Sequence, residues 1–197
     1  MTDIRLTKSK LRQRYIEIRS KVDKAYREKA SNAAAAILTR QSFFQRSQHI
    51  ACYLPFKKEF DSWPIIEAIW RAKKNCYLPV LQEDKSLWFI RYVKNDALKQ
   101  NQFAIFEPVD HSNKLSADEL DMVLAPLVAF DSSGQRLGTG GGYYDRTFCN
   151  LDVTNKKPLM IGLAYQAQEA ESIPHEPWDI KLDGVITEQG FTGFQLF

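Results

Sequence analysis

Short apolar segments with the length of β-strands alternate along this chain with longer segments of helical periodicity. Residues 122–125 and 159–163 are apolar at successive positions, which is typical of strands covered by helices on both faces. Further segments have strand-like composition, namely residues 49–54, 75–81, 87–93, 127–130 and 184–187. The alternation predicts an α/β fold: one layered α/β/α domain over residues 1–197 with a largely parallel central sheet.

Three helices are expected in the first part of the chain. Apolar residues recur at helical spacing within residues 7–22, and basic residues fill the other faces. A second helix is expected to begin after Asp23 as its N-cap and to extend to about residue 45. Asp61 is expected to cap a third helix that tolerates Pro64 in its first turn.

The segment from residue 94 to residue 119 is polar, and it is expected to be irregular. Phe103, Ile105 and Phe106 are the apolar residues expected to anchor it to the core. Trp88 and Trp178 are likewise expected to serve in packing.

Composition narrows the class of protein. Hydrophobic residues make up 44% of the chain and charged residues 26%, which is typical of a globular protein. The net charge of +3 is too small to indicate a nucleic-acid partner. Three widely spaced cysteines favour a reducing compartment over a disulfide framework or a structural zinc site. The longest apolar stretch, residues 124–130, is too short to span a bilayer. We expect a cytoplasmic monomer without a membrane or nucleic-acid partner.

The most informative segment runs from residue 126 to residue 146. Asp131 and Gly134 suit the first and last positions of a type I turn that follows a strand. The four glycines at 138 and 140–142 permit unusual backbone conformations and leave room for a ligand. A helix that begins near Gly142 would direct its free amides toward a phosphate. Local pattern alone leaves a flexible turn as plausible as a phosphate site, because neither a Walker sequence nor a GxGxxG pattern is present.

The complete string is more specific than its glycines. Arg-Leu-Gly-x-Gly-x-Gly-Tyr-Tyr-Asp, here residues 136–145, follows a Phe-Asp-x-x-Gly turn. It resembles the signature of the 5-formyltetrahydrofolate cyclo-ligase family. The resemblance extends to Lys8, Leu11, Arg12, Leu54-Pro55, Glu59, Glu107-Pro108 and Trp178-Asp179. The chain departs from some members of the family at Gly141, where they carry a lysine expected to touch phosphate.

The resemblance implies an ATP-dependent ligase that cyclises 5-formyltetrahydrofolate to 5,10-methenyltetrahydrofolate and releases ADP and phosphate. ATP and Mg²⁺ are the implied cofactors, and the substrate is a small molecule. The residues expected to bind ATP are Lys8, Arg12, Arg136, Leu137, Gly138, Thr139, Gly140, Gly141, Gly142, Tyr143 and Tyr144.

The resemblance also assigns the remaining site residues. Tyr144 and Arg146 are the expected catalytic residues, and Asp145 and Asp179 the expected metal ligands. Leu54, Glu59 and Tyr143 are expected to bind the folate.

Local rules leave several of these roles open. Lys10 and Arg14 have the same spacing as Lys8 and Arg12, so a shift of two residues would exchange the pairs. Glu59 also suits a helix entry, Asp179 also suits a cap, and Leu54 also suits the core.

Two other classes of protein remain as alternatives. One is a sugar-phosphate isomerase or CoA-transferase-like enzyme, which would share a layered architecture and a glycine-rich anion loop. The other is a nucleic-acid-binding or regulatory protein that uses the basic residues Lys8, Lys10, Arg12, Arg14, Arg19 and Lys21. Binding to a phosphate backbone would fall steeply with salt concentration, which separates this alternative from a small-molecule enzyme.

Overall fold

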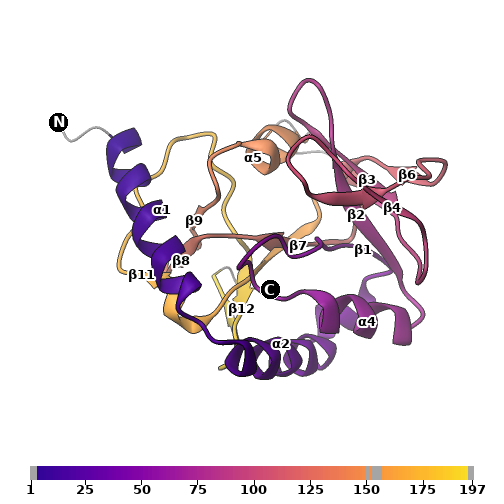
Figure 1. Cartoon of the computed structure of the whole chain (residues 1–197), viewed down its shortest axis with the longest axis horizontal. Helices are drawn as coiled ribbons and strands as arrows, with labels where there is room; N and C mark the ends of the chain where they lie inside the picture. Colours follow the sequence, from indigo (N-terminus) through magenta and orange to yellow (C-terminus); the bar gives the residue numbers. More distant parts are fainter. Residues whose placement is uncertain (1–3, 150, 152–156, 195–197) are drawn as a thin grey trace.

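The structure is a computed structural model that describes residues 4–149, 151 and 157–194. Its main element is an eight-stranded sheet in the order β13-β12-β10-β7-β1-β2-β3-β6 (Figure 1). The five central strands β12, β10, β7, β1 and β2 pair in parallel, and the outer strands pair antiparallel. In sheet order the bounds are Phe191–Gly193, Gly184–Ile186, Leu159–Leu163, Met122–Pro126, His49–Ala51, Asn75–Leu81, Leu87–Arg91 and Lys114–Leu115. The expected largely parallel sheet is confirmed.

Side chains alternate between the two faces of the sheet, as the pleat requires. Along β1 and the residue after it, Ile50 and Cys52 join one hydrophobic cluster, whereas Ala51 joins the other. The first cluster is covered by α2 (Lys24–Thr39), α3 (Ser42–Arg46) and α4 (Trp63–Arg71). The second is covered by the 3₁₀ turn η1 (Ala117–Glu119) and the short helix α5 (Tyr143–Phe148). Figure 1 shows α2 and α4 below the sheet and α5 above it, so the fold is layered.

Helix α1 (Ile4–Ser20) lies beside the carboxyl ends of the parallel strands rather than on a face of the sheet (Figure 1). Its Tyr15 belongs to a hydrophobic cluster with Ala129, Leu137 and Ala170. These residues lie in a small sheet formed by β8 (Ala129–Asp131), β9 (Arg136–Leu137) and β11 (Glu169–Ala170). The Tyr15 hydroxyl donates to the backbone oxygen of Glu169 at 3.1 Å. Because ligands bind open α/β sheets at this edge, α1 forms one wall of the position where a site is expected.

Several expected boundaries differ from the observed ones. The second helix is interrupted at residues 40–41, where Arg40 is the C-cap of α2 and α3 follows as a separate turn. The third helix has Ser62 as its N-cap, while Asp61 accepts a hydrogen bond from the Trp63 amide at 3.1 Å. Pro64 lies in the first turn of α4, as expected.

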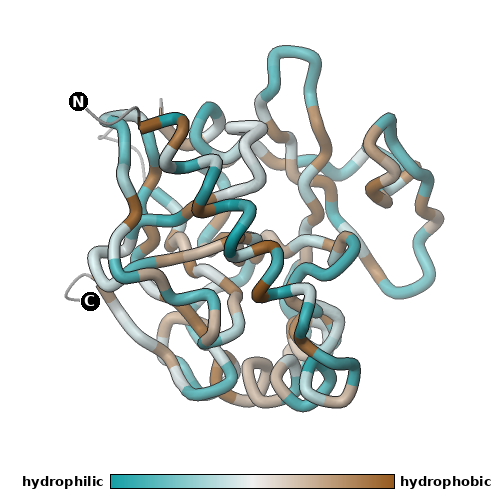
Figure 2. The backbone as a smooth tube through the Cα atoms, turned by 60° about the vertical axis from the view of Figure 1, so that its left-hand side comes forward, coloured by the Kyte–Doolittle hydropathy of each residue, from teal (hydrophilic) through white to brown (hydrophobic). Residues whose placement is uncertain are grey.

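The expectation that residues 94–119 are irregular was wrong, because β6, η1 and two further strands lie within them, and two of the three expected anchors are exposed while Ile105 is half-buried. Phe103 and Phe106 are each 49% exposed, because the segment folds into a separate hairpin of β4 (Leu98–Gln100) and β5 (Phe106–Pro108). Glu107 and Pro108 are the buried residues of this strand instead. Trp178 is 59% exposed and is not a packing residue of the core. Figure 2 shows that the turn between β2 and β3, which projects at the top of the molecule, is hydrophilic.

Candidate active site

The glycine loop connects β9 to α5 and lies next to α1. Gly140 has φ of 108° and Gly142, the N-cap of α5, has φ of 70°, both in the region that favours glycine. Gly138 and Gly141 do not have positive φ. Since α5 has six residues, its macrodipole is short, and an anion at this loop would be bound mainly by individual backbone amides.

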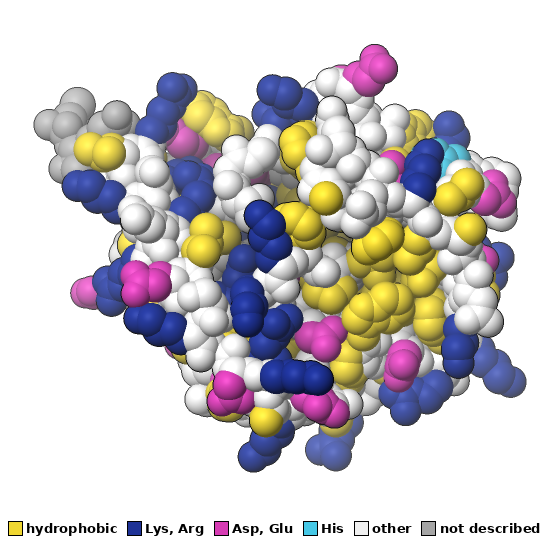
Figure 3. Space-filling view, in the orientation of Figure 1, with side chains coloured by type: hydrophobic (Ala, Val, Ile, Leu, Met, Phe, Trp, Pro, Cys, Tyr) yellow, Lys and Arg dark blue, Asp and Glu magenta, His cyan; other side chains and the backbone are white. Residues whose placement is uncertain are grey.

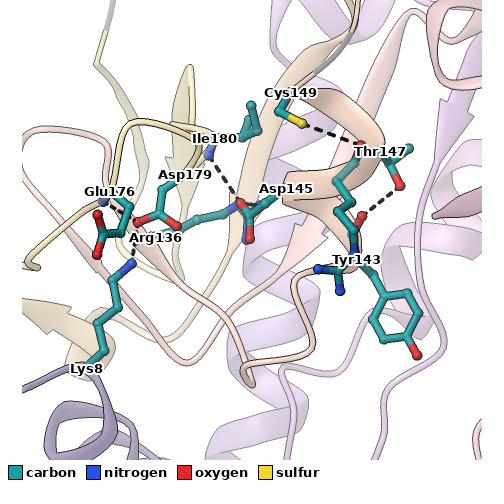
Figure 4. Close-up of polar contacts among 10 residues, drawn as sticks. Lys8, Arg136, Tyr143, Asp145, Thr147, Cys149, Glu176, Asp179 and Ile180 are labelled. Carbon is teal, nitrogen blue, oxygen red and sulfur yellow. Dashed lines mark hydrogen bonds and ion pairs between the residues drawn. The ribbon is translucent and has the colours of Figure 1, made fainter. Parts of the chain in front are cut away.

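Arg136 and Asp145 connect the two ends of the loop. Arg136 Nη2 donates to Asp145 Oδ1 at 2.6 Å, and the Ile180 amide donates to the same oxygen at 3.1 Å. The Arg136 guanidinium also lies over the Tyr144 ring, 5.6 Å from its centroid. Arg136, expected to bind phosphate, and Asp145, expected to bind metal, are thus paired with each other (Figure 4).

Lys8 and Asp179 form a second pair of the same kind. The Lys8 ammonium of α1 donates to Asp179 Oδ2, which also accepts the Glu176 amide at 2.8 Å. This pair is largely shielded, with side chains 12% and 17% exposed. Figure 4 shows it beside the Arg136–Asp145 pair, and Ile180, which binds Asp145, directly follows Asp179.

The structure favours one of the two registers on α1. Arg12 Nε donates to the Gly138 carbonyl at 2.9 Å, and a Cβ on Gly140 would lie 3.6 Å from the Arg12 guanidinium carbon. Lys8 and Arg12 are half-buried against the rest of the molecule, whereas Lys10 and Arg14 are exposed. Lys8 and Arg12 are therefore the pair that faces the loop.

Asp145 and Asp179 are suitable but incomplete ligands for a divalent cation. Each has one carboxylate oxygen with no hydrogen-bond partner among the described residues. Within the part of the chain that the structure describes, no three His, Cys, Asp or Glu side chains are grouped to hold a metal ion. Mg²⁺ is commonly held by one or two carboxylates together with water and substrate phosphates, and these two residues fit that pattern.

Glu59 lies in the loop that follows β1, at the carboxyl end of the sheet. Its Oε2 accepts the Phe56 amide at 3.1 Å. Burial raises the pKa of Glu59, and the Phe56 amide and the charge of Arg19 oppose that shift. Glu59 and Cys52 contribute to a raised pKa of Tyr144, whose main cause is again burial. The fold thus brings the carboxylate after β1 and the phenol of α5 near each other.

Other expected site residues have different surroundings. Leu54 and Leu137 are buried in hydrophobic clusters, so Leu137 has only its backbone to offer a nucleotide. Thr139 and Gly141 are exposed. Tyr143 packs against the cluster under α5, and a Cβ on Gly141 would lie 2.8 Å from its ring. A lysine at position 141 would therefore require the Tyr143 ring to move.

Arg146 lies on the outer side of the loop. Its Nη2 donates to the Gly141 carbonyl and its Nε to the Lys85 carbonyl at 3.4 Å. Arg146 thus ties the β2–β3 turn to the loop, and its side chain is exposed.

One buried charge was not singled out from the sequence. Arg19 is 7% exposed and binds the Leu127 carbonyl at 3.2 Å through Nη1. In the sequence it belongs only to a basic helix, although its spacing of seven residues from Arg12 places both on one side of α1.

Figure 3 shows basic side chains running down the middle of the face of the molecule seen in Figure 1, beside a broad hydrophobic area.

These features define an α/β protein with a glycine-rich loop at the carboxyl ends of its strands and a half-buried carboxylate at the same edge of the sheet. The model of the 5-formyltetrahydrofolate cyclo-ligase family matches residues 5–188, and the chain belongs to this family.

Relatives agree with this assignment. The 5-formyltetrahydrofolate cyclo-ligase of Haemophilus influenzae is 43% identical over 145 residues, covering 72% of this chain and 76% of that protein. The protein of the same name from Caenorhabditis elegans, described as probable, is 29% identical over 197 residues and covers 95% of this chain and 96% of its own. The NMR structure of Aquifex aeolicus 5,10-methenyltetrahydrofolate synthetase superposes with a TM-score of 0.82 at 30% identity, covering 96% of this chain and 94% of that one. The family expected from the glycine loop is confirmed.

The comparisons give no support to the two alternative classes, the isomerase or transferase-like enzyme and the nucleic-acid-binding protein. Among the described residues, no helix has both the length and the apolar character needed to cross a membrane.

Proposed function

We propose that this protein catalyses the ATP-dependent cyclisation of 5-formyltetrahydrofolate to 5,10-methenyltetrahydrofolate, with release of ADP and phosphate. The observation that carries the proposal is that the glycine loop, the cations Lys8 and Arg12 of α1 and the half-buried Glu59 lie at one edge of the sheet. A phosphate-binding loop and a polar group for a heterocycle thus lie in one site.

The reaction requires activation of an oxygen. The formyl oxygen is a poor leaving group, and the neighbouring amine nitrogen cannot expel it as hydroxide. Transfer of the terminal phosphoryl group to this oxygen forms a P–O bond and breaks the bond to ADP. The amine then attacks the formyl carbon, the ring closes, and phosphate leaves with the former formyl oxygen. Such a site works mainly by positioning and by electrostatic stabilisation.

The nucleotide phosphates would lie between the loop and α1. Arg12 is already oriented by the Gly138 carbonyl, and Lys8 and Arg136 are held ready by their carboxylate partners. Bound Mg²⁺ would supply positive charge to the phosphates. Asp145 and Asp179 would be the residues that hold this cation, and Lys8 and Arg136 would bind phosphate oxygens.

Tyr144 and Arg146 are proposed to act on the reacting groups. Burial raises the pKa of Tyr144, so its phenol keeps its proton at neutral pH and serves as a hydrogen-bond donor rather than as a base. Arg146 contacts the Gly141 carbonyl and would hold the exposed side of the loop over the transferred phosphoryl group.

Glu59 and Tyr143 are proposed to bind the folate, Glu59 through its carboxylate oxygens and Tyr143 through its ring. Leu54, which is buried, is proposed to contribute an apolar wall. A carboxylate is a suitable acceptor for the N–H groups along one edge of a pterin.

The phosphorylation step is tested by following the formyl oxygen. Substrate carrying a heavy oxygen isotope in its formyl group is turned over, and the released phosphate is examined by mass spectrometry. We expect one labelled oxygen in each phosphate. Label that appears only in water would show that the formyl oxygen leaves without being phosphorylated.

We further propose that the protein acts as a monomer in the cytoplasm. All three cysteines are free thiols, and Cys52 and Cys76 are buried in or beside neighbouring strands, which suits a reducing compartment. Sedimentation at micromolar concentration checks the oligomeric state.

A further inference from the structure

We propose that Arg19 is a substrate-binding residue, whose guanidinium holds the oxygen-bearing edge of the pterin opposite Glu59. The proposal rests on the function proposed above and adds a residue to its folate site. It is carried by the position of Arg19 on α1, by its burial and by the groups around it.

Arg19 lies further along α1 than the residues proposed to bind phosphate. Arg12 and Arg19 are seven residues apart, or about two helical turns and 10 Å along α1. Arg12 binds the Gly138 carbonyl of the loop, whereas Arg19 binds the carbonyl of Leu127, just after β7. A nucleotide phosphate held at Arg12 therefore leaves Arg19 for the second substrate.

Burial makes the charge of Arg19 costly unless a ligand compensates it. Arg19 is 7% exposed, and its Nε has no hydrogen-bond partner among the described residues. Lys8 and Arg136 each have a carboxylate partner, but no ion pair joins Arg19 to an acidic side chain within the same described ranges. A buried cation with an open donor is destabilising in the free protein and favours an incoming oxygen.

The one hydrogen bond of Arg19 does not account for its presence. The Leu127 carbonyl also accepts from Gln168 Nε2 at 3.1 Å, and the same amide donates to the Val128 carbonyl at 2.9 Å. The backbone oxygen would keep a partner if Arg19 were replaced. Arg19 is therefore not needed to satisfy this turn.

The groups near Arg19 have the opposite character. Its positive charge lowers the pKa of Glu59 and of Tyr53 against the raising effect of burial. The backbone of Glu59 is held by Arg27, whose Nη2 donates to the Glu59 carbonyl oxygen at 3.3 Å. Glu59 follows β1, and Leu127, which binds Arg19, follows β7. Because β1 and β7 are parallel neighbours, the carboxylate and the guanidinium belong to adjacent strand ends, and no ion pair joins them among the described residues.

A formylated pterin matches such a pair. Its amino-pyrimidine edge carries N–H donors for Glu59, and its ring carbonyl and formyl oxygens are acceptors for Arg19. An arginine donor on those oxygens would select the orientation in which the formyl oxygen points away from Glu59 and toward the glycine loop. Arg19 would then set which atom reaches the phosphoryl group.

The test compares Arg19→Met with Arg14→Met, which makes the same change at an exposed position of the same helix. Measured quantities are the melting temperature, the Kd of ATP, the Kd of 5-formyltetrahydrofolate and kcat. We expect Arg19→Met to weaken folate binding roughly 10- to 100-fold and to lower kcat, since the formyl oxygen is no longer oriented. The Kd of ATP should stay within about twofold, and the melting temperature should be unchanged or higher. Arg19→Lys should recover part of the folate affinity, and Arg14→Met should leave all four quantities unchanged.

Two results would overturn the proposal. A lower melting temperature of Arg19→Met with normal folate binding would show a structural role for Arg19. Weaker ATP binding with unchanged folate binding would place Arg19 at the phosphates. If wild-type protein formed no product yet folate binding still depended on Arg19, the proposed reaction would fail while the assignment of Arg19 as a folate ligand would stand.

Discussion

Arg136 and Asp145 form an ion pair of 2.6 Å that joins the strand entering the glycine loop to the helix leaving it. The Arg136 side chain is 5% exposed and the Asp145 side chain 24%. Because Asp145 also accepts the Ile180 amide, the same carboxylate connects the loop to the segment that carries Asp179. The two ends of the loop are thus joined by charged groups that we propose to bind phosphate and metal.

Breaking this pair from one side should destabilise the protein. Arg136→Met or Asp145→Leu leaves one partner buried without its counter-charge, which we expect to cost about 3 kcal/mol in the free energy of unfolding. The double variant should lose clearly less than the sum of the two single losses, because neither charge remains. Urea unfolding of the four proteins measures this coupling. Fully additive losses would show that the pair does not act as a unit.

The conformation of Gly140 makes a second prediction. Gly140→Ala places a side chain at φ of 108°, and its Cβ would meet the Arg12 side chain at an ordinary 3.6 Å, so backbone strain is what opposes the change. We expect a loss of about 2 kcal/mol in stability. Gly138→Ala is the matched control for stability, because its φ is not positive and its Cβ would meet Arg136 at an ordinary 3.6 Å. Equal melting temperatures for the two variants would mean that the loop adapts without strain.

Burial of Glu59 makes its contribution to stability dependent on pH. Its folded pKa is raised above the ordinary 4.5, so the folded protein keeps a proton that the unfolded chain has lost. Stability from this group is present below about pH 4.5 and is lost as pH rises through the folded pKa. Glu59→Gln should therefore melt higher than wild type near pH 7.5, and the difference should shrink near pH 5. A variant that melts lower at both pH values would contradict this account of Glu59.

Thiol reactivity should separate the three cysteines. Burial raises the pKa of Cys52 to about 12 and the pKa of Cys76 well above its ordinary value, whereas Cys149 is exposed. At about pH 8 a thiol reagent should modify one cysteine quickly in the folded protein and three after denaturation. Cys149→Ser should abolish the fast reaction. A fast reaction that persists in Cys149→Ser would come from Cys52 or Cys76 and would show that the sheet opens around β1 and β2.

Parts of this structure could be predicted because their signal is local. The apolar residues of β7 and β10 indicate strands covered on both faces, and the spacing within α1 indicates a helix. The glycine loop was located by its own residues. Such features depend on neighbours in sequence, so one chain is sufficient to find them.

Other parts depend on contacts between distant segments. Lys8 and Asp179 are 171 positions apart, and nothing in the sequence around either residue indicates that the two form an ion pair. Burial of Arg19 could not be predicted for the same reason, since the backbone oxygen that it binds belongs to Leu127, 108 positions away. Phe103 and Phe106 appeared to be core residues by composition, but the hairpin that carries them projects from the main sheet.

The central claim is tested most directly by measuring product formation with the purified protein. The absorbance of 5,10-methenyltetrahydrofolate is followed with 5-formyltetrahydrofolate in the complete mixture, then with ATP or Mg²⁺ omitted. We predict product only in the complete mixture, with one ADP released for each product molecule. A folded protein that binds both substrates yet forms no product, or one that forms it equally well without ATP, would contradict the account.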